Sequence, residues 1–124
     1  MAPIIPHTAR QTRQEIGQAG EDAAARHLAA QGLRLVERNF RVRGGEIDLV
    51  CRDGATVVFV EVRRRAASAD FYDAAASIGP AKQRRLILAA RHWLAQHGEA
   101  PCRFDCVLID GDRLNWIKDA FRPD

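Results

Sequence analysis

The stretch GEIDLV at residues 45–50 is followed, eight residues further on, by VFVEVRRR at residues 58–65. Both stretches are rich in Val, Ile, Leu and Phe, which is typical of buried β-strands. Each nevertheless carries acidic side chains in its interior, Glu46 and Asp48 in the first and Glu61 in the second. Burying a carboxylate is costly unless a partner compensates its charge. These carboxylates therefore need a partner, and a bound cation is one candidate.

The turn between the two stretches predicts how they pair. Asp53-Gly54 is a strong signal for a two-residue hairpin turn, and with that turn the residue numbers of facing positions sum to 107. Glu46 then lies opposite Glu61, with Asp48 as a diagonal neighbour. Because side chains alternate along a strand, one face collects four charged residues: Glu46, Asp48, Glu61 and Arg63. A solvated face balanced by its arginines is the alternative to a cation site.

The rest of the chain predicts an α/β domain. Helices are expected over residues 15–31, 71–77 and 80–96, and strands over residues 33–41, 46–52, 55–65, 102–109 and 113–118. The order αβββααββ implies one domain, residues 14–124, in which helices flank a central mixed five-stranded sheet. Residues 1–13 lack any periodicity and are expected to form a flexible N-terminal tail.

Residue spacing predicts the two long helices. Over residues 15–31, Ile16, Ala19, Ala23, His27 and Ala30 recur at steps of three and four. Over residues 80–96, the expected core stripe is Leu86, Ala90, Trp93 and Leu94. This spacing is the one that places residues on a single side of an α-helix.

Length and composition favour a cytoplasmic, single-domain protein. The chain has 124 residues, 47% of them hydrophobic, which fits one globular core. No apolar run approaches the roughly 20 residues that span a bilayer, so no membrane partner is expected. The first seven residues lack a long apolar segment, so secretion is not indicated. Three cysteines without a closed spacing pattern suit a reducing compartment.

Arginine dominates the basic residues, accounting for 17 of the 19. The planar guanidinium binds phosphate through two parallel hydrogen bonds, so a polyanionic partner is plausible even though the net charge is only +3. The same bias also arises from genomic composition, and charge alone leaves the two explanations open.

The acidic pattern resembles the core of the PD-(D/E)XK nuclease superfamily, in which an acidic residue is followed, after a gap, by Asp/Glu-x-Lys. Here the corresponding residues are Asp48 and Glu61-Val62-Arg63. More closely, the chain resembles the YraN family of small bacterial proteins with a Holliday-junction-resolvase-like fold. The matching segments are Gly20–Ala24, Glu37–Arg41, Gly44–Val50, Phe59–Arg65, Lys82 and Arg103–Asp105.

The resemblance implies a restriction-endonuclease-like sheet and metal-dependent phosphodiester chemistry, directed at DNA that is branched or otherwise structured. It implies that Asp48 and Glu61 bind Mg²⁺ or Mn²⁺, and that Glu21 on the first helix completes the metal site. It implies supporting roles for Glu46 and Asp105, although pairing of Asp105 with Arg103 as a structural acid is favoured. Resolvase-like relatives often form dimers, so the resemblance leaves a homodimer open.

Arg63 departs from the superfamily pattern, which has lysine at this position. Lysine can lose its proton when desolvated and help to activate water, whereas arginine stays protonated and cannot act as a base. Arg63 is still able to orient a phosphate or stabilise transition-state charge. Three functions therefore stay open: an endonuclease, a catalytically impaired nucleic-acid-binding module, and a non-enzymatic interaction domain.

Other basic residues are expected to contact nucleic acid. Arg38, Arg41 and Arg43 surround the loop before Gly44-Gly45, a position from which side chains can grip a phosphate backbone. Lys82, at the start of the long helix, matches the lysine that the YraN family carries there. The expected nucleic-acid contacts are thus Arg38, Arg41, Arg43, Arg65 and Lys82, and exposed side chains without a ligand are the alternative for each.

Overall fold

The computed structural model describes residues 12–64 and 78–123. It confirms the expected α/β fold, and the described elements follow the order αβββαββ. These elements are α1 (Arg13–Ala30), β1 (Arg34–Val42), β2 (Gly45–Asp53), β3 (Thr56–Arg64), α3 (Pro80–His97), β4 (Cys102–Asp110) and β5 (Arg113–Phe121). Most ends lie within two residues of their expected positions, but β5 continues beyond Lys118 to Phe121. The short helix expected over residues 71–77, and residues 1–11 of the expected tail, lie outside the described residues.

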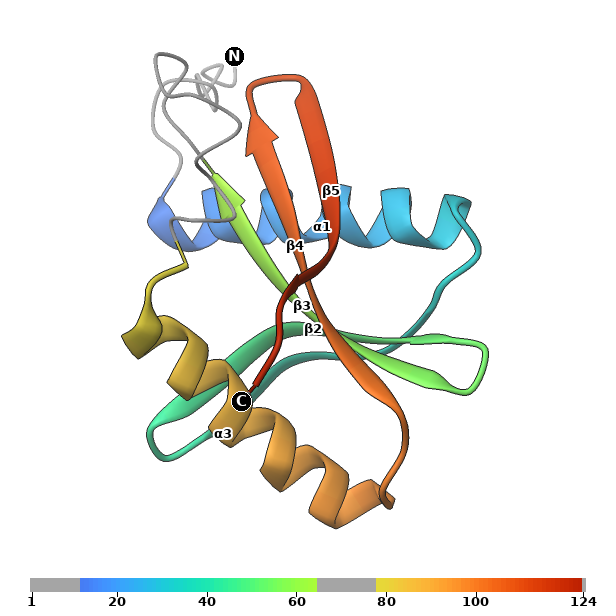
Figure 1. The fold of residues 1–124 in the computed structure, drawn as a ribbon. Helices are drawn as coiled ribbons and strands as arrows, with labels where there is room; N and C mark the ends of the chain where they lie inside the picture. Colours follow the sequence, from blue (N-terminus) through green and yellow to red (C-terminus); the bar gives the residue numbers. More distant parts are fainter. Residues whose placement is uncertain (1–11, 65–77, 124) are drawn as a thin grey trace, which may run out of the picture.

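The sheet has the strand order β1-β2-β3-β4-β5. Its neighbouring strands are antiparallel except for β3 and β4, which are parallel. A parallel pair requires a crossover connection, and the chain segment that contains α3 provides it. Figure 1 shows α1 and α3 on opposite faces of the sheet. The sheet is therefore the middle layer of three.

Each helix covers its own hydrophobic core. Under α3, the buried rings of Trp93 and Phe59 meet edge to face with their centroids 5.9 Å apart. Under α1, Leu28 packs with Val58 and Val60 of the central strand β3. Burying one such side chain contributes roughly 1.5–3 kcal/mol, so both helices are held on the sheet by apolar contacts.

The expected core stripe of α3 is confirmed, since Leu86, Ala90, Trp93 and Leu94 are all buried. The buried residues of α1 are Gly20, Ala24 and Leu28, whereas Ala19 and Ala30 are exposed. A Cβ atom on Gly20 would lie 3.6 Å from side-chain atoms of Arg64 and Ile109, which is an ordinary van der Waals distance. The face of α1 that packs on the sheet therefore consists of two small residues and Leu28.

The predicted hairpin register between β2 and β3 is also wrong. Asp53 pairs with Thr56, and the two turn residues are Gly54 and Ala55. Gly54 has a φ angle of 61°, a conformation that favours glycine and that hairpin turns require at their first central position. The residue numbers of facing positions therefore sum to 109 instead of 107.

Side-chain alternation also breaks in the middle of β2. Ile47 and Val50 both belong to the core under α3, whereas Leu49 belongs to the core under α1. The single face predicted for Glu46 and Asp48 therefore does not follow from a simple alternation along β2. The break falls at Asp48, just beyond Leu49–Val60, the last residue pair of the β2–β3 ladder.

Gly44 and Gly45 bring α3 close to the hairpin formed by β1 and β2. A Cβ atom on Gly45 would collide with the backbone carbonyl oxygen of Arg85 and would lie 3.2 Å from the backbone nitrogen of Ala89. Gly44 has a φ angle of 85° and lies beneath the Leu88 side chain. The glycine pair, which precedes Glu46 and Asp48 in sequence, is therefore a packing site for the α3 backbone.

We predict that Gly45→Ala destabilises the protein by about 2–3 kcal/mol, because the added methyl group overpacks against an immobile helix backbone. The matched control is Gly17→Ala on α1, where a Cβ atom would meet nothing within 4 Å and the alanine improves helix propensity by up to about 1 kcal/mol. Urea unfolding followed by circular dichroism measures both. A Gly45→Ala variant as stable as the wild type would contradict the close packing of α3 on β2.

Candidate active site

Two carboxylates meet where β2 and β3 stop pairing. Beyond the last residue pair of the two strands, a side chain accepts the hydrogen bond in place of the β2 backbone. Oδ2 of Asp48 accepts a hydrogen bond of 2.8 Å from the backbone N–H of Val62. Glu61, the neighbour of Val62 on β3, is only 4% exposed. The two carboxyl groups are close enough to interact by a hydrogen bond and by charge repulsion. The structure thus brings together the two residues that the sequence pattern paired.

The Asp48 carboxyl group holds its proton unusually strongly. Burial raises its pKa most, and the hydrogen bond and the negative charge of Glu61 raise it further, to about 7. The Val62 N–H and the Lys82 ammonium act in the opposite direction without cancelling this effect. Asp48 therefore holds its proton to a pH near neutrality when no metal is bound.

Two cations contact Glu61 from different elements. The Nζ atom of Lys82, in the first turn of α3, lies 3.3 Å from Oε2 of Glu61. The Nη1 atom of Arg63 on β3 lies 3.7 Å from the same oxygen. β3 carries Arg63 where the superfamily pattern has lysine, and a lysine amine reaches Glu61 from α3 instead. Sequence analysis included Lys82 only as a nucleic-acid contact and missed its place at the carboxylates.

Glu46 is the third acidic residue near Asp48 and Glu61. Its carboxylate is 3.9 Å from Nζ of Lys82 and 3.4 Å from Nε of Arg41 on β1. Lys82 therefore bridges Glu46 and Glu61. The expected supporting position of Glu46 is consistent with this geometry, and Arg41 is engaged with a carboxylate of the cluster.

Glu21 approaches Asp48 from α1. Its side chain is 14% exposed, and its pKa is raised mainly by burial and secondly by the negative charge of Asp48. Nδ2 of Asn39 donates a hydrogen bond of 3.1 Å to its Oε1. Arg38 lies 3.5 Å from Glu21 and also forms an ion pair of 2.6 Å with Asp22. Arg38 is thus an internal partner of α1 in this structure.

Asn39 is a site residue that sequence analysis missed. It lies inside β1 yet has a φ angle of 54°, in a region that few residues other than glycine adopt and that asparagine tolerates best. This backbone conformation accompanies the contact of its amide with Glu21. The sequence did offer one indication of this role, because Asn39 is a polar residue in the middle of a predicted strand. It also lies within the YraN-like segment Glu37–Arg41.

The acidic residues do not form a preassembled metal site. Within residues 12–64 and 78–123, no three His, Cys, Asp or Glu side chains are placed to hold one metal ion together. The donor set of Asp48 and Glu61, with Glu21 nearby, consists only of carboxylate oxygens, which suits Mg²⁺ or Mn²⁺ surrounded partly by water. The fit therefore rests on two adjacent carboxylates, and Glu21 would have to move to join them.

The remaining expected site residues lie elsewhere or outside the described ranges. Asp105 is buried and accepts hydrogen bonds from Nε of Arg103 (3.0 Å), Nε1 of Trp116 (2.9 Å) and the backbone N–H of Asp119 (2.9 Å). This confirms its pairing with Arg103 and gives it a structural role between β4 and β5. Arg65 lies outside the described residues.

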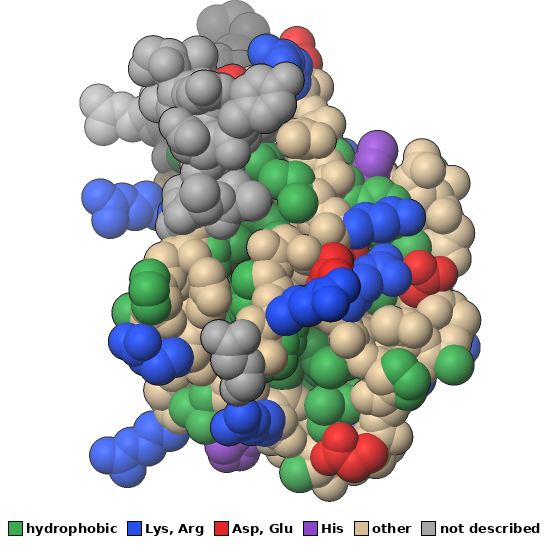
Figure 2. Space-filling model, in the orientation of Figure 1, with side chains coloured by type: hydrophobic (Ala, Val, Ile, Leu, Met, Phe, Trp, Pro, Cys, Tyr) green, Lys and Arg blue, Asp and Glu red, His purple; other side chains and the backbone are tan. Residues whose placement is uncertain are grey.

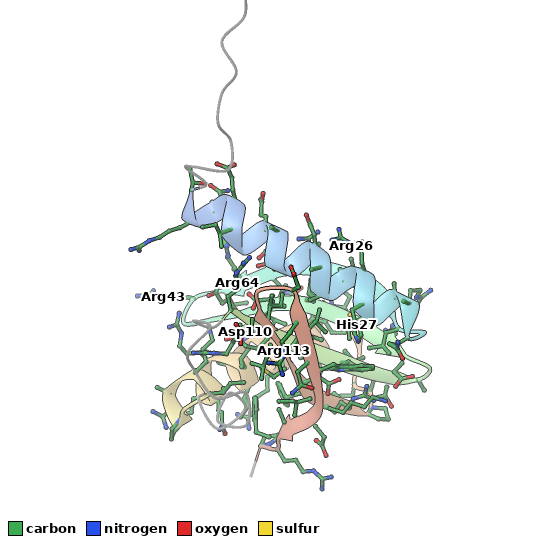
Figure 3. All side chains as sticks on the ribbon, turned by 90° about the horizontal axis from the view of Figure 1, so that it is seen from above. Arg26, His27, Arg43, Arg64, Asp110 and Arg113 are labelled. Atoms are coloured by element: carbon green, nitrogen blue, oxygen red, sulfur yellow. The ribbon has the colours of Figure 1, made fainter. Side chains whose placement is uncertain are left out.

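Arg43 occupies the exposed turn between β1 and β2. Figure 3 shows it at the outer end of this hairpin, whereas Arg64 lies beside α1. The Nη1 atom of Arg64 donates a hydrogen bond of 3.3 Å to the backbone carbonyl of Ile16 on that helix. Arg43 therefore projects from the rim of the molecule, and Arg64 secures α1 to the end of β3.

Comparison with known proteins relates most of the chain to one protein family. A profile of the uncharacterised protein family UPF0102 matches residues 20–109, a range that includes Glu21, Asp48, Glu61 and Lys82. A UPF0102 protein of Dechloromonas aromatica is 62% identical over 108 residues, which cover 87% of this chain and 89% of the relative. A UPF0102 protein of Herminiimonas arsenicoxydans is 55% identical over 119 residues, 95% of each chain.

Neither of the two described helices, α1 and α3, is long and apolar enough to cross a membrane.

We predict that Asp48→Asn stabilises the metal-free protein at pH 8 by roughly 1–2 kcal/mol. The amide oxygen of the asparagine still accepts the hydrogen bond from Val62, and the neutral side chain is not repelled by the Glu61 carboxylate. Because the folded-state pKa of Asp48 is raised from 3.8 to about 7, its contribution to stability is complete below pH 4 and is lost as pH rises to 7. The advantage of the variant should therefore shrink at pH 5.

Thermal unfolding in EDTA between pH 5 and 8 measures this difference. The matched control is Asp112→Asn in the exposed β4–β5 turn, which should show no such pH dependence. An Asp48→Asn variant that is less stable than the wild type at pH 8 would contradict the repulsion between Asp48 and Glu61.

Proposed function

This chain belongs to the UPF0102 family, and we propose that it binds structured nucleic acid and cleaves its phosphodiester bonds at the cluster formed by Asp48, Glu61 and Lys82. UPF0102 is the YraN family, so the resemblance inferred from the sequence motifs is confirmed. The observation that carries the proposal is the contact of Lys82 Nζ with Glu61 at 3.3 Å, beside a second carboxylate. An amine and paired carboxylates are the groups that this hydrolysis uses.

Each residue of the cluster has a chemical task in the proposed reaction. Asp48 and Glu61 would hold Mg²⁺ or Mn²⁺, which when bound lowers the pKa of an attacking water and neutralises charge on the phosphate. Lys82 would orient the attacking water or donate hydrogen bonds to a phosphate oxygen. The hydrogen bond from Val62 holds Asp48 in place, and Glu61 would contribute the second carboxylate to the cation.

Arg63 need not supply the base in this arrangement. Its guanidinium stays charged and, from its position 3.7 Å from Glu61, is suited to hold a phosphate oxygen. Lys82 is half-buried beside two carboxylates and places a lysine amine next to Glu61. The departure from the Asp/Glu-x-Lys pattern is therefore compensated by a lysine on another element.

The distribution of basic residues favours a nucleic-acid partner over a generic interaction domain. Arg38, Arg41, Arg63 and Lys82 each contact a carboxylate at or beside the cluster: Glu21, Glu46 or Glu61. Three of the five cations expected to bind nucleic acid, together with Arg63, thus lie in one part of the molecule. A surface that served only protein contacts would not require this convergence.

A nucleic-acid-binding module without catalysis is the second candidate. The observation in its favour is that no three acidic, His or Cys side chains of the described chain are placed for a shared metal. In this function the cations contact phosphates and no metal is needed. Binding would then persist in EDTA and weaken steeply with salt.

The test is cleavage of branched, flapped and single-stranded DNA by the purified protein in Mn²⁺. We expect cleavage by the wild type and a loss of at least roughly 100-fold in Asp48→Ala, as is usual when charge stabilisation is removed. Gel analysis of end-labelled substrates measures the rates. Absence of cleavage by the wild type, with Asp48→Ala behaving identically, would reject the enzyme and leave the binding module.

Two further variants separate the roles of the cations. Lys82→Met is expected to lower the cleavage rate roughly 100-fold, because no other amine reaches Glu61 among the described residues. Arg63→Lys keeps a positive charge next to Glu61 and should retain the rate within about 10-fold. The reverse order, with Arg63→Lys the more damaging substitution, would contradict the assignment of the amine to Lys82.

A further inference from the structure

The outer side of α3 carries a hollow of about 570 Å³, which the last described residues help to line. Arg84 and Arg91 on the helix and Arg122 after β5 contribute its basic groups, and Ile87 and Leu88 lie between them. We call this hollow the α3 groove. Figure 2 shows Lys and Arg side chains interspersed with hydrophobic ones over the part of the surface where α3 lies in Figure 1.

The charge of α3 has one sign. Its 18 residues include Lys82 and three arginines but no Asp or Glu. Arg84 and Arg91 are exposed, and the ion pairs found among residues 12–64 and 78–123 include neither of them. Arg38 and Arg41, by contrast, are compensated by acidic side chains. Arg84 and Arg91 thus give α3 a positive charge that no acidic side chain of the described residues compensates.

The apolar residues of the groove already have partners within the protein. Ile87 packs against the core under α3, and Leu88 covers Gly44. Among the described residues, no aromatic side chain lines the groove, so these residues offer no stacking surface of the kind that proteins use to hold unpaired bases. What the groove offers to a ligand is therefore mainly guanidinium groups, which suit a sugar–phosphate backbone.

The spacing along the helix matches a backbone of several nucleotides. Arg84 and Arg91 are seven residues apart, roughly 10 Å along an α-helix, and Lys82 lies two residues before Arg84. Lys82 and Arg91 are separated by roughly 14 Å along the helix axis, about four base pairs of duplex rise, but they lie on opposite sides of α3. The groove begins at Pro80, in the same turn of α3 from which Lys82 contacts Glu61 in the candidate active site.

We propose that the α3 groove binds the phosphate backbone of a duplex arm that continues from the strand held at Asp48 and Glu61. The inference rests on the proposed nucleic-acid function and adds the substrate class: a nucleic acid with a duplex arm of at least about four base pairs next to the site of reaction. A single strand of equal length makes fewer of these contacts.

The test is binding without cleavage, measured by fluorescence anisotropy in EDTA with a 20-base-pair duplex and its single strand as probes. Arg84→Gln/Arg91→Gln should weaken duplex binding by about 10-fold and lower the slope of log K against log salt by about 2, one for each lost phosphate contact. The single strand should lose less. The matched control is Arg13→Gln/Arg26→Gln, with the same charge change on exposed α1, which should leave the duplex slope unchanged.

Three outcomes would overturn the inference. Equal losses in the α3 and α1 double variants would mean that only net charge matters. Unchanged duplex binding in Arg84→Gln/Arg91→Gln, combined with loss of binding to a polyglutamate probe, would assign the groove to an acidic peptide. No duplex binding by the wild type, whatever the salt, would reject the nucleic-acid function itself and this inference with it.

Discussion

Two carboxylates held against each other are the constraint on which the rest of this structure depends. Asp48 and Glu61 meet where β2 and β3 separate, in a half-buried environment that raises the pKa of Asp48 to about 7. Packing alone gives no reason for such a pair, because its repulsion and desolvation cost stability. The backbone N–H of Val62 and the ammonium of Lys82 offset part of this cost. A site that is costly in the folded protein is expected where its chemistry is used.

The placement of α3 follows from the same requirement. Lys82 reaches Glu61 because the helix backbone lies directly on Gly45, and the buried ring of Trp93 holds the far half of the helix on the sheet. The short segment from Gly44 to Asp48 thus combines two tasks. Gly44 and Gly45 allow α3 to pack closely on the hairpin, and Glu46 forms an ion pair with Lys82 of that helix.

Local patterns in the sequence were sufficient to predict the two described helices, the strands and the pairing of Asp48 with Glu61. They did not predict the register between β2 and β3, because it depends on whether Asp53 or Gly54 begins the turn, and an aspartate-glycine pair is compatible with both. The contact of Lys82 with Glu61 joins residues on opposite sides of a crossover connection, and Asn39 acts through an unusual φ angle. Neither the Lys82–Glu61 contact nor the φ angle of Asn39 produces a periodic pattern in the sequence.

The expected functions of the arginines changed most between sequence and structure. Arg38 is engaged with Asp22 and Glu21, and Arg41 with Glu46, so both balance acidic side chains near the cluster. Arg84 and Arg91, which share one side of α3, form no ion pair within residues 12–64 and 78–123. Counting basic residues in the sequence does not distinguish these two situations, because the distinction depends on which acids each side chain can reach.

The most direct test of the account is a crystal structure obtained with Mn²⁺, in which anomalous scattering locates the metal. The account predicts an anomalous peak coordinated by both Asp48 and Glu61, with Lys82 displaced from its contact at 3.3 Å with Glu61. Crystals that hold Mn²⁺ elsewhere, or none at millimolar concentration, while Lys82 stays on Glu61, would contradict the claim that these carboxylates form a metal-dependent active site.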